Sequence, residues 1–310
     1  MFDAQRIFDF LYQRIANGER ACLVTVTDVT GASVRNPGAH MAVAADGTYL
    51  GSLSGGCIEN AIVQEALLAI GDNAPRQAAY GAGSPFIDIR LPCGGRVDLL
   101  LNPIMDLEIV NMLRGAAYRR EPWTLALPIT QGAIDLADTG KTAWRGELFH
   151  VHHSPALKIL IAGHGGSLEA LVRQANAMTI ECDVATPDAD FAVRLKKVVA
   201  SHVHVLERLS DPLPVAPDAY SACVFLFHDH DWEARLLAEA LNSPAFYVGA
   251  MGSRRTHAAR CEALAEIGIS EDLIARIDAP IGLIGSSRDP ETLALSILAQ
   301  VVDRYNRFIS

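Results

Sequence analysis

The apolar positions of the first thirty residues change from a helical period to a strand pattern. Spacings of three and four residues predict an amphipathic first helix, whose apolar positions are Ile7, Phe10, Leu11 and Ile15. The next run, residues 21–29, is apolar and rich in β-branched side chains, as expected of a strand. A turn containing Gly31, Pro37 and Gly38 follows it.

Residues 40–56 predict a β-hairpin, because two apolar runs are joined by Asp46-Gly47, a strong two-residue hairpin signal. A helix is then expected over residues 57–71, ended by Gly71. Its apolar face consists of Ile58, Ile62, Ala66 and Ile70. Further strands are predicted at residues 86–91 and 96–102, on either side of a Pro-Cys-Gly-Gly break.

The signals weaken between residues 105 and 153. A helix at 106–120 and short strands at 124–130 and 132–138 are interpreted as a return to the first sheet. The segment 150–155, with sequence HVHHSP, has no period and ends in a proline, so we interpret it as a boundary loop. The sequence therefore predicts one mixed α/β domain over residues 1–153 and a second domain over residues 154–310.

Apolar strands alternate with amphipathic helices in the second domain. Strand segments are expected at residues 156–163, 179–186, 202–206, 222–230 and 244–253, with helices after the first, fourth and fifth and a long final helix beginning at Pro290. Such alternation indicates βαβ units and a parallel sheet covered on both faces. The prediction is a doubly wound, Rossmann-like domain.

Composition narrows the function classes. The net charge is −10 and no basic block is present, which argues against a nucleic-acid partner. No apolar run reaches the length of a membrane span, and the N-terminal segment lacks the pattern of a signal peptide. The six cysteines form no CxxC pair, so we expect free thiols in a reducing cytoplasm.

The first candidate site is the sequence GSLSGGCIEN. Gly55 and Gly56 allow the backbone to approach a ligand closely, and the helix start favours the thiolate of Cys57. That thiolate could bind a soft metal or carry sulfur, and Glu59 could act as acid, base or hydrogen-bond acceptor. The alternative is a tight turn followed by a buried, unreactive cysteine.

A second loop of the same kind is LPCGGR, with Cys93, Gly94 and Gly95 at the start of a strand. Two such loops in one small domain are more informative than either alone. Together they could form one anion-binding pocket that contains thiols. If they are unrelated, each is a turn.

The second domain has three further candidates. Gly163 and Gly165 fill the first two glycine positions of a dinucleotide-binding loop, but Leu168 occupies the third, and the second strand ends at Thr186 with Asp188 as the nearest carboxylate. That loop therefore predicts the fold better than it predicts a bound dinucleotide.

His228 and Asp229 end an apolar strand with His230, where they could contact a ligand or a metal. Alternatively the cluster caps a strand and a helix, with Asp231 as N-cap. The histidines at 150–153 also resemble a metal-binding tract in a loop.

The loop at Gly249 and Gly252 precedes Ser253, Arg254 and Arg255 at a helix start, an arrangement that suits a phosphate or a phosphorylated pterin. The alternative is a helix cap with solvated arginines.

Taken together, these motifs resemble the xanthine dehydrogenase accessory protein family, the XdhC/CoxI group. The resemblance covers nearly the whole chain and rests on five segments in order: residues 25–59, 91–103, 227–241, 247–260 and 279–300. It implies binding of the molybdenum cofactor (molybdopterin), its protection during sulfuration, and its delivery to a molybdenum hydroxylase. By correspondence with the family's motifs, Cys57 and Cys93 are the residues expected to contact metal or sulfur.

The resemblance further implies a xanthine-dehydrogenase-like client, a cysteine desulfurase as a second partner, and a homodimer. The family's glycine loop and its Thr-His-Asp motif are altered here to Gly163-His164-Gly165-Gly166 and Phe227-His228-Asp229. These departures weaken the case for NAD(P) in the second domain. Two other hypotheses remain: an NAD(P)-dependent oxidoreductase, and a regulatory protein that senses a nucleotide or redox state through its thiols.

Overall fold

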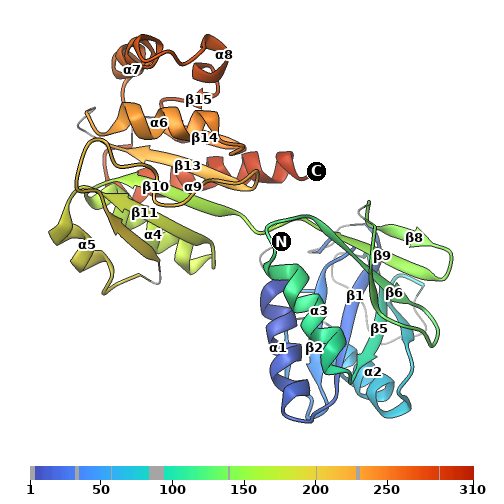
Figure 1. Cartoon of the computed structure of the whole chain (residues 1–310). Helices are drawn as coiled ribbons and strands as arrows, with labels where there is room; N and C mark the ends of the chain where they lie inside the picture. The colour runs from blue at the N-terminus through green and yellow to red at the C-terminus, as the bar shows by residue number, and fades with distance from the viewer. Residues whose placement is uncertain are drawn as a thin grey trace. The chain divides into compact units, whose positions relative to one another are not determined.

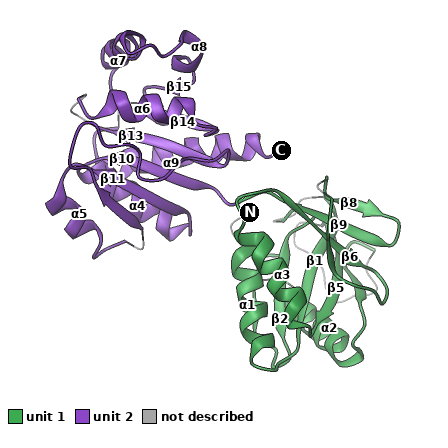
Figure 2. Ribbon diagram, in the orientation of Figure 1, with its two compact units in different colours: residues 1–155 green, residues 156–310 purple. Residues whose placement is uncertain are grey.

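A computed structural model describes residues 4–31, 35–56, 58–83, 94–138, 140–199, 201–227, 231–285 and 287–310. The chain forms two compact units, residues 1–155 and 156–310 (Figure 2). The sequence predicted a change of domain two residues earlier, after residue 153. Each unit has its own core and is described by itself.

The described part of unit 1 contains three helices and two sheets (Figure 1). The helices are α1 (Ala4–Ala16), α2 (Glu59–Asp72) and α3 (Leu107–Tyr118). The strands are β1 (Ala21–Thr30), β2 (His40–Ala44), β3 (Tyr49–Leu50), β4 (Arg76–Gly81), β5 (Arg96–Ile104), β6 (Trp123–Pro128), β7 (Asp135–Ala137), β8 (Ala143–Arg145) and β9 (Leu148–His153). The first sheet has the order β3-β2-β1-β5-β4 and is antiparallel throughout.

The alternation of side chains along β1 explains how this sheet is covered on both faces. Cys22 and Val24 pack with α2 on one face, whereas Ala21 and Leu23 pack with α1 and α3 on the other. Strand β1 is therefore buried on both sides, which is why its sequence is a continuous apolar run and does not alternate. The predicted hairpin is present, with β2 paired to β3 and Gly47 in the left-handed region at φ 82°.

The strands after α3 were predicted to return to the first sheet. They instead form a second antiparallel sheet of order β7-β6-β9-β8. The segment His150–His153, predicted to be a boundary loop, is part of β9 in this sheet. Phe149 and Val151 are buried in the core of unit 1, His150 and His152 occupy the alternate positions, and His153 lies on the same face as Phe149 and Val151. This period of two is a strand signal that the polar character of histidine concealed.

Helix α2 also differs from its prediction at both ends. It begins at Glu59, not at Cys57, and it continues through Gly71 to Asp72. Asn73 takes the left-handed conformation after the helix, at φ 48°, and its amide donates to the carbonyl of Ala69. Asparagine tolerates this conformation, and a single glycine in an exposed last turn costs only about 1 kcal/mol, so Gly71 did not end the helix.

Unit 2 is a doubly wound domain around a parallel sheet, as predicted. The order of its described strands is β12-β11-β10-β13-β14-β15. They are β10 (Lys158–Gly163), β11 (Glu181–Thr186), β12 (His202–Val205), β13 (Ser221–Leu226), β14 (Tyr247–Ala250) and β15 (Ile277–Asp278). The helices are α4 (Gly166–Ala177), α5 (Ala189–Leu195), α6 (Glu233–Asn242), α7 (Arg254–Glu266), α8 (Glu271–Ile274) and α9 (Pro290–Phe308).

The strand order reverses between β10 and β13, and ligands of such sheets bind outside the carboxyl ends of the strands at this point. The chain leaves β10, β13 and β14 at this edge. Helix α6 begins at Glu233 with Trp232 at the N-cap position, so Asp231 is not its N-cap, contrary to the prediction. The cap of α9 is Asp289, which precedes Pro290 and accepts a hydrogen bond from the amide of Thr292.

Candidate functional site

The Gly-Gly-Cys loop of unit 1 is organised by the carboxylate of Glu59. Its Oε1 accepts hydrogen bonds from the hydroxyl of Ser52 at 2.7 Å and from the amides of Leu53 and Ser54 at 3.1 and 3.0 Å. Its Oε2 accepts from the hydroxyl of Ser54 at 2.6 Å and from the amide of Ile58 at 3.2 Å. One buried side chain in the first turn of α2 therefore holds both residues 52–54 and Ile58, on either side of the two glycines.

These bonds decide which of the predicted roles Glu59 can take. Burial by itself raises the pKa of a carboxyl group, but the bonds from Ser54 and Ser52 outweigh it and lower the pKa of Glu59 to about 2. Glu59 is thus an ionised hydrogen-bond acceptor at neutral pH. Its lone pairs are directed at the loop, so it is a structural anchor and not a general acid.

The two glycines of this loop have backbone conformations that other residues rarely adopt. Gly55 and Gly56 lie at φ 78° and 107°. A side chain at Gly56 would meet no atom within 4 Å, so the backbone conformation alone calls for glycine there. Both residues are exposed, which leaves this loop open to a ligand.

Gly94 and Gly95 of the Cys-Gly-Gly loop precede β5, at the end of the first sheet toward which the segment after Leu50 also runs. Thr30 is paired with Arg96 at this end, and the register of β2 with β1 and β3 directs the segment after Leu50 toward it. Gly95 packs directly against Gly31, whose Cβ would lie 3.2 Å from the Cα of Gly95, and Gly94 lies at φ 66°. The topology therefore directs the two glycine segments toward one end of the first sheet, which the two-loop hypothesis requires.

The two thiols of this hypothesis, Cys57 and Cys93, lie outside the described residues. Within the described ranges, no group of three or more His, Cys, Asp or Glu side chains could hold a metal ion. The predicted metal role of Cys57 and Cys93 therefore stays a prediction. Cys22, Cys182 and Cys223 are buried free thiols whose burial raises their pKa, and Cys261 is a half-buried free thiol.

Sequence analysis missed a histidine pair in unit 1. The Nε2 atoms of His40 and His153 lie 3.2 Å apart, and Nδ1 of His40 lies 2.9 Å from the hydroxyl of Thr25. The ring of His153 stacks on Trp123 with centroids 4.2 Å apart, and Phe8 closes the cluster. Since the two histidines are 113 positions apart, no local sequence signal could have joined them.

In unit 2, the glycine loop after β10 is shaped by close contact with β13. A Cβ at Gly163, where φ is 147°, would lie 2.5 Å from the carbonyl oxygen of Leu226. Gly165 is the N-cap of α4 at φ 89° and makes no side-chain cap. Leu168 is fully buried below the first turn. The loop therefore leaves the amides at the start of α4 open, which is the arrangement that binds anions.

The loop after β14 differs from its predicted role in one respect. The hydroxyl of Ser253 caps α7, accepting from the amide of Thr256 at 3.2 Å and lying 3.0 Å from its hydroxyl. The alternative interpretation as a helix cap is thus correct for Ser253. Arg254 and Arg255 are exposed at the start of the helix. Gly252 is at φ 139°, and a Cβ there would lie 2.7 Å from the methyl of Thr256.

A buried ion pair lies below this loop. Arg260 of α7 donates from Nε and Nη2 to the two carboxylate oxygens of Glu233 at 2.9 and 3.0 Å, and from Nη2 to the carbonyl of Met251 at 2.7 Å. Both side chains are 2% exposed. Both residues lie within segments that carry the family resemblance, 227–241 and 247–260, but neither was among the predicted site residues. The predicted site residues His228 and Asp229 lie outside the described residues.

The carboxylate expected to bind a ribose is engaged elsewhere. Asp188 caps α5 by accepting from the amide of Phe191 at 2.8 Å, and Thr186 at the end of β11 is fully buried. A dinucleotide would therefore have to displace a helix cap to use Asp188.

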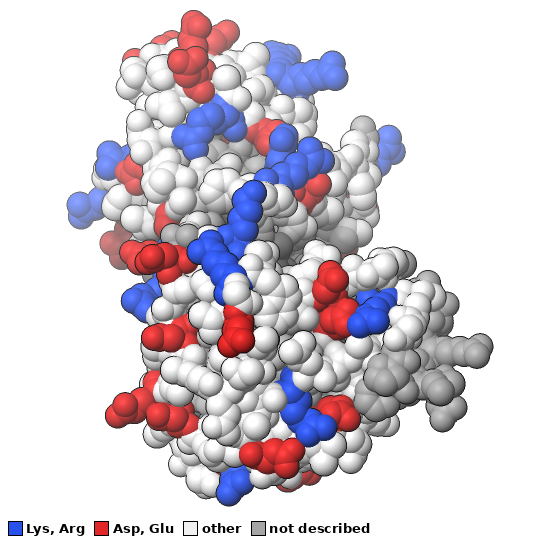
Figure 3. All heavy atoms as spheres, turned by 90° about the vertical axis from the view of Figure 1, so that its right-hand side faces the viewer, with Lys and Arg blue, Asp and Glu red and all other residues white. Residues whose placement is uncertain are grey.

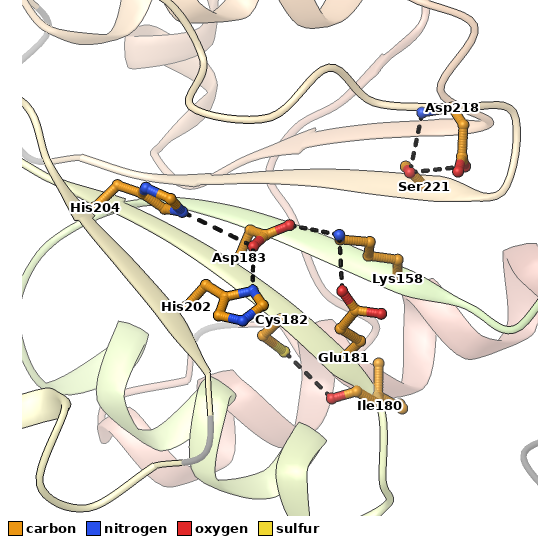
Figure 4. Close-up of polar contacts among 9 residues, drawn as sticks. All are labelled: Lys158, Ile180, Glu181, Cys182, Asp183, His202, His204, Asp218 and Ser221. Atoms are coloured by element: carbon orange, nitrogen blue, oxygen red, sulfur yellow. Dashed lines mark hydrogen bonds and ion pairs between the residues drawn. The ribbon is translucent and has the colours of Figure 1, made fainter. Parts of the chain in front are cut away.

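A second polar cluster lies at the amino ends of β10, β11 and β12 (Figure 4). The ammonium of Lys158 lies 2.7 Å from Asp183 and 2.8 Å from Glu181, and Nδ1 of His202 lies 3.3 Å from Asp183. The side chain of Asp183 is 1% exposed. Burial alone would lower the pKa of Lys158, but its bonds to Asp183 and Glu181 raise it above the usual value. The cluster is an ion-pair network at the edge opposite the glycine loop.

The distribution of charged side chains on the surface does not favour one candidate site over another. On the face drawn in Figure 3, most of the area is uncharged and side chains of both signs are scattered over it. Among the described residues, no helix has the length and apolar character needed to cross a membrane.

Comparison with known proteins places the chain in a family. A model of the XdhC and CoxI family matches residues 14–81, and a model of the XdhC Rossmann domain matches residues 159–301. The chain is 34% identical over 300 residues to the molybdenum cofactor insertion chaperone PaoD of Escherichia coli, covering 96% of this chain and 88% of that protein. This protein belongs to the XdhC/CoxI family, as its motifs predicted.

Two further likenesses are more distant. The chain is 24% identical over 289 residues to YqeB of Escherichia coli, an uncharacterised protein, and covers 43% of it. The solved structure of a protein described as a xanthine dehydrogenase from Bacillus halodurans matches with a TM-score of 0.76 and 20% identity. The match covers 97% of this chain and 96% of that one, and it supports the two-unit fold.

Proposed function

We propose that this protein binds the molybdenum cofactor and delivers it to a molybdenum hydroxylase similar to xanthine dehydrogenase. The observation that carries the proposal is the 34% identity to a molybdenum cofactor insertion chaperone over 96% of the chain. The alignment spans both units and not one motif alone. A role shared with that chaperone is therefore the simplest explanation.

In this proposal the cofactor is cargo, held at the end of the first sheet where the two glycine loops emerge. The binding residues are Gly55, Gly56 and Cys57 of one loop and Cys93, Gly94 and Gly95 of the other, with the two thiolates in contact with the metal or its sulfur. The anchoring of the first loop by Glu59 supports the proposal, because a loop ordered before binding loses little conformational entropy on binding.

The proposal extends to the partners. Sulfuration of the cofactor while it is bound would require a cysteine desulfurase that approaches the same loops, and the client enzyme would then receive the sulfurated cofactor. A homodimer would present two such sites.

The experiment is to express the chain in a host that makes the cofactor and to purify it without oxygen. Molybdenum and pterin are expected in near-equal molar amounts with the protein. Cys57→Ala should reduce both at least tenfold, while Cys261→Ala, which removes a half-buried thiol of unit 2, should retain them. Transfer is measured as the activation of a cofactor-free molybdenum hydroxylase.

Two outcomes would contradict parts of the proposal. A purified chain that contains a nicotinamide dinucleotide and no molybdenum or pterin would favour an oxidoreductase. Full cofactor content in both Cys57→Ala and Cys93→Ala, with transfer intact, would leave the chaperone function in place but remove the thiols from the site.

A further inference from the structure

In unit 2, the turn after β14 lies against the buried guanidinium of Arg260. The N-termini of α4, α6 and α7 follow β10, β13 and β14, so all three helices begin at the carboxyl edge of the parallel sheet. Each helix directs free amides and the positive end of its dipole toward this edge. The edge therefore attracts anions before any side chain is considered.

Helix α7 has a charged group, the guanidinium of Arg260, directly below its first turn. Ser253 caps only the amide of Thr256, and by helix geometry the amides of Arg254 and Arg255 point out of the helix end. The guanidinium of Arg260, one to two turns further along, donates to the carbonyl of Met251 in the turn itself. A Cβ at Gly252 would lie 3.6 Å from Nη2 of Arg260, so the turn lies directly on the guanidinium.

The hydrogen bonds of Arg260 are incomplete. Nε and Nη2 donate to Glu233 and Met251, whereas Nη1 is buried and has no hydrogen-bond partner among the described residues. A buried donor on a charged group is costly to leave unpaired, because it has lost its hydrogen bonds to water. Such a donor, oriented by a carboxylate and placed under a helix N-terminus, is what a bound oxyanion would satisfy.

We propose that Arg260, oriented by Glu233, is a phosphate-binding residue of unit 2. The ligand is a molecule with a phosphate or diphosphate group, held between Nη1 of Arg260 and the first amides of α7. Because Nη1 is shielded from solvent, the turn at Met251–Ser253 shifts to admit the phosphate, and Gly252 without a side chain permits the shift. The phosphate belongs either to a dinucleotide or to the phosphorylated pterin of the cofactor.

The test measures pyrophosphate binding to the full chain by titration calorimetry. Replacing both partners, Arg260→Met with Glu233→Leu, keeps the net charge and leaves no buried charge unpaired, so the fold should be retained. Binding is expected to weaken at least tenfold. The matched control is Arg307→Met with Asp303→Leu, an exposed ion pair on α9, which should bind pyrophosphate within twofold of the unchanged chain.

A second variant distinguishes the loss of a phosphate-binding group from misfolding of the protein. Arg260→Lys keeps a cation beside Glu233 but loses the planar guanidinium, and it should weaken binding at least fivefold with a melting temperature near that of the parent. The proposal is wrong if pyrophosphate does not bind the unchanged chain, or if it binds the folded variants as tightly as the parent.

Two further arms identify the source of the phosphate. Binding of NAD⁺ that weakens in the same variants assigns the site to a dinucleotide. Loss of bound pterin from the Arg260 variants, with NAD⁺ not bound by the parent, assigns it to the cofactor. If pyrophosphate binding depends on Arg260 and no molybdenum cofactor is ever found, the inference stands and the proposed function falls.

Discussion

The Nε2 atoms of His40 and His153 lie 3.2 Å apart, and this contact joins the two sheets of unit 1. His40 belongs to β2 of the first sheet and His153 to β9 of the second. Burial lowers the pKa of His40 to about 3 and, together with the neighbouring His40, lowers the pKa of His153 well below its usual value. Both imidazoles are therefore neutral in the folded protein at neutral pH.

This pair predicts that unit 1 loses stability as the pH falls below about 6.5, the usual histidine pKa in an unfolded chain. The unfolded state then takes up protons that the folded pair excludes, so each histidine contributes a slope that approaches about 1.4 kcal/mol per pH unit. Urea unfolding between pH 5 and 8 measures this dependence of the unfolding free energy on pH. Trp232 is replaced by Phe so that tryptophan fluorescence reports on unit 1. Equal pH slopes in the parent and in His40→Leu/His153→Phe would rule the pair out as the cause.

The anchoring role of Glu59 predicts that a single substitution of this residue lowers the stability of the protein strongly. Glu59→Gln keeps the shape but places an amide donor opposite the amides and hydroxyls that now donate to the carboxylate, and should cost about 2–3 kcal/mol. Glu65→Gln on the same helix breaks a partly exposed ion pair with Arg76 and should cost less than about 1 kcal/mol. Urea denaturation at pH 7 compares the two variants, and similar losses would contradict the anchoring role.

The contribution of Glu59 should itself depend on pH. Its pKa is about 2 when folded and about 4.3 in an unfolded chain, so the stabilisation is complete above the unfolded value. It is lost as the pH falls from there toward 2. The difference in unfolding free energy between the parent and Glu59→Gln should therefore be constant from pH 6 to 8 and shrink below pH 4.

The contact of Gly163 with β13 predicts that Gly163→Ala is strongly destabilising. The new Cβ would meet the backbone oxygen of Leu226 at 2.5 Å, and backbone cannot move aside as a side chain can. The expected loss is about 2–4 kcal/mol. Gly268→Ala has a positive φ of 87° but open space, and should lose only about 1 kcal/mol. A Gly163→Ala variant as stable as Gly268→Ala would show that β10 and β13 separate easily.

The ion-pair network of Figure 4 predicts that removing one charged partner destabilises the protein more than removing both partners. Lys158→Met leaves the buried Asp183 carboxylate without its cation, at an expected cost of about 2–4 kcal/mol. Lys158→Met with Asp183→Leu should recover most of that loss, because no buried charge remains. Thermal unfolding of the two variants decides the matter, and Glu181→Gln, at an exposed position, serves as the control.

The elements of both units could largely be predicted from local sequence. The apolar runs of β1, β10 and β13, the Asp46-Gly47 turn and Pro290 at the start of α9 each act within a few residues. Apolar runs, turn residues and helix caps are signals within a few residues, so these predictions did not depend on the rest of the chain. The five motif segments in order were sufficient to identify the family.

What the sequence could not determine is how distant segments meet. The polar tract His150–His153 became a strand only because Phe149 and Val151 had a core to enter, and His153 found His40 across that core. Glu59 is seen as an anchor only when the loop folds back on its carboxylate, and Arg260 only when α6 brings Glu233 beside it. Hydrophobic periodicity decides which elements form, whereas a buried polar group takes its partner from whatever segment packing places within about 3 Å of it.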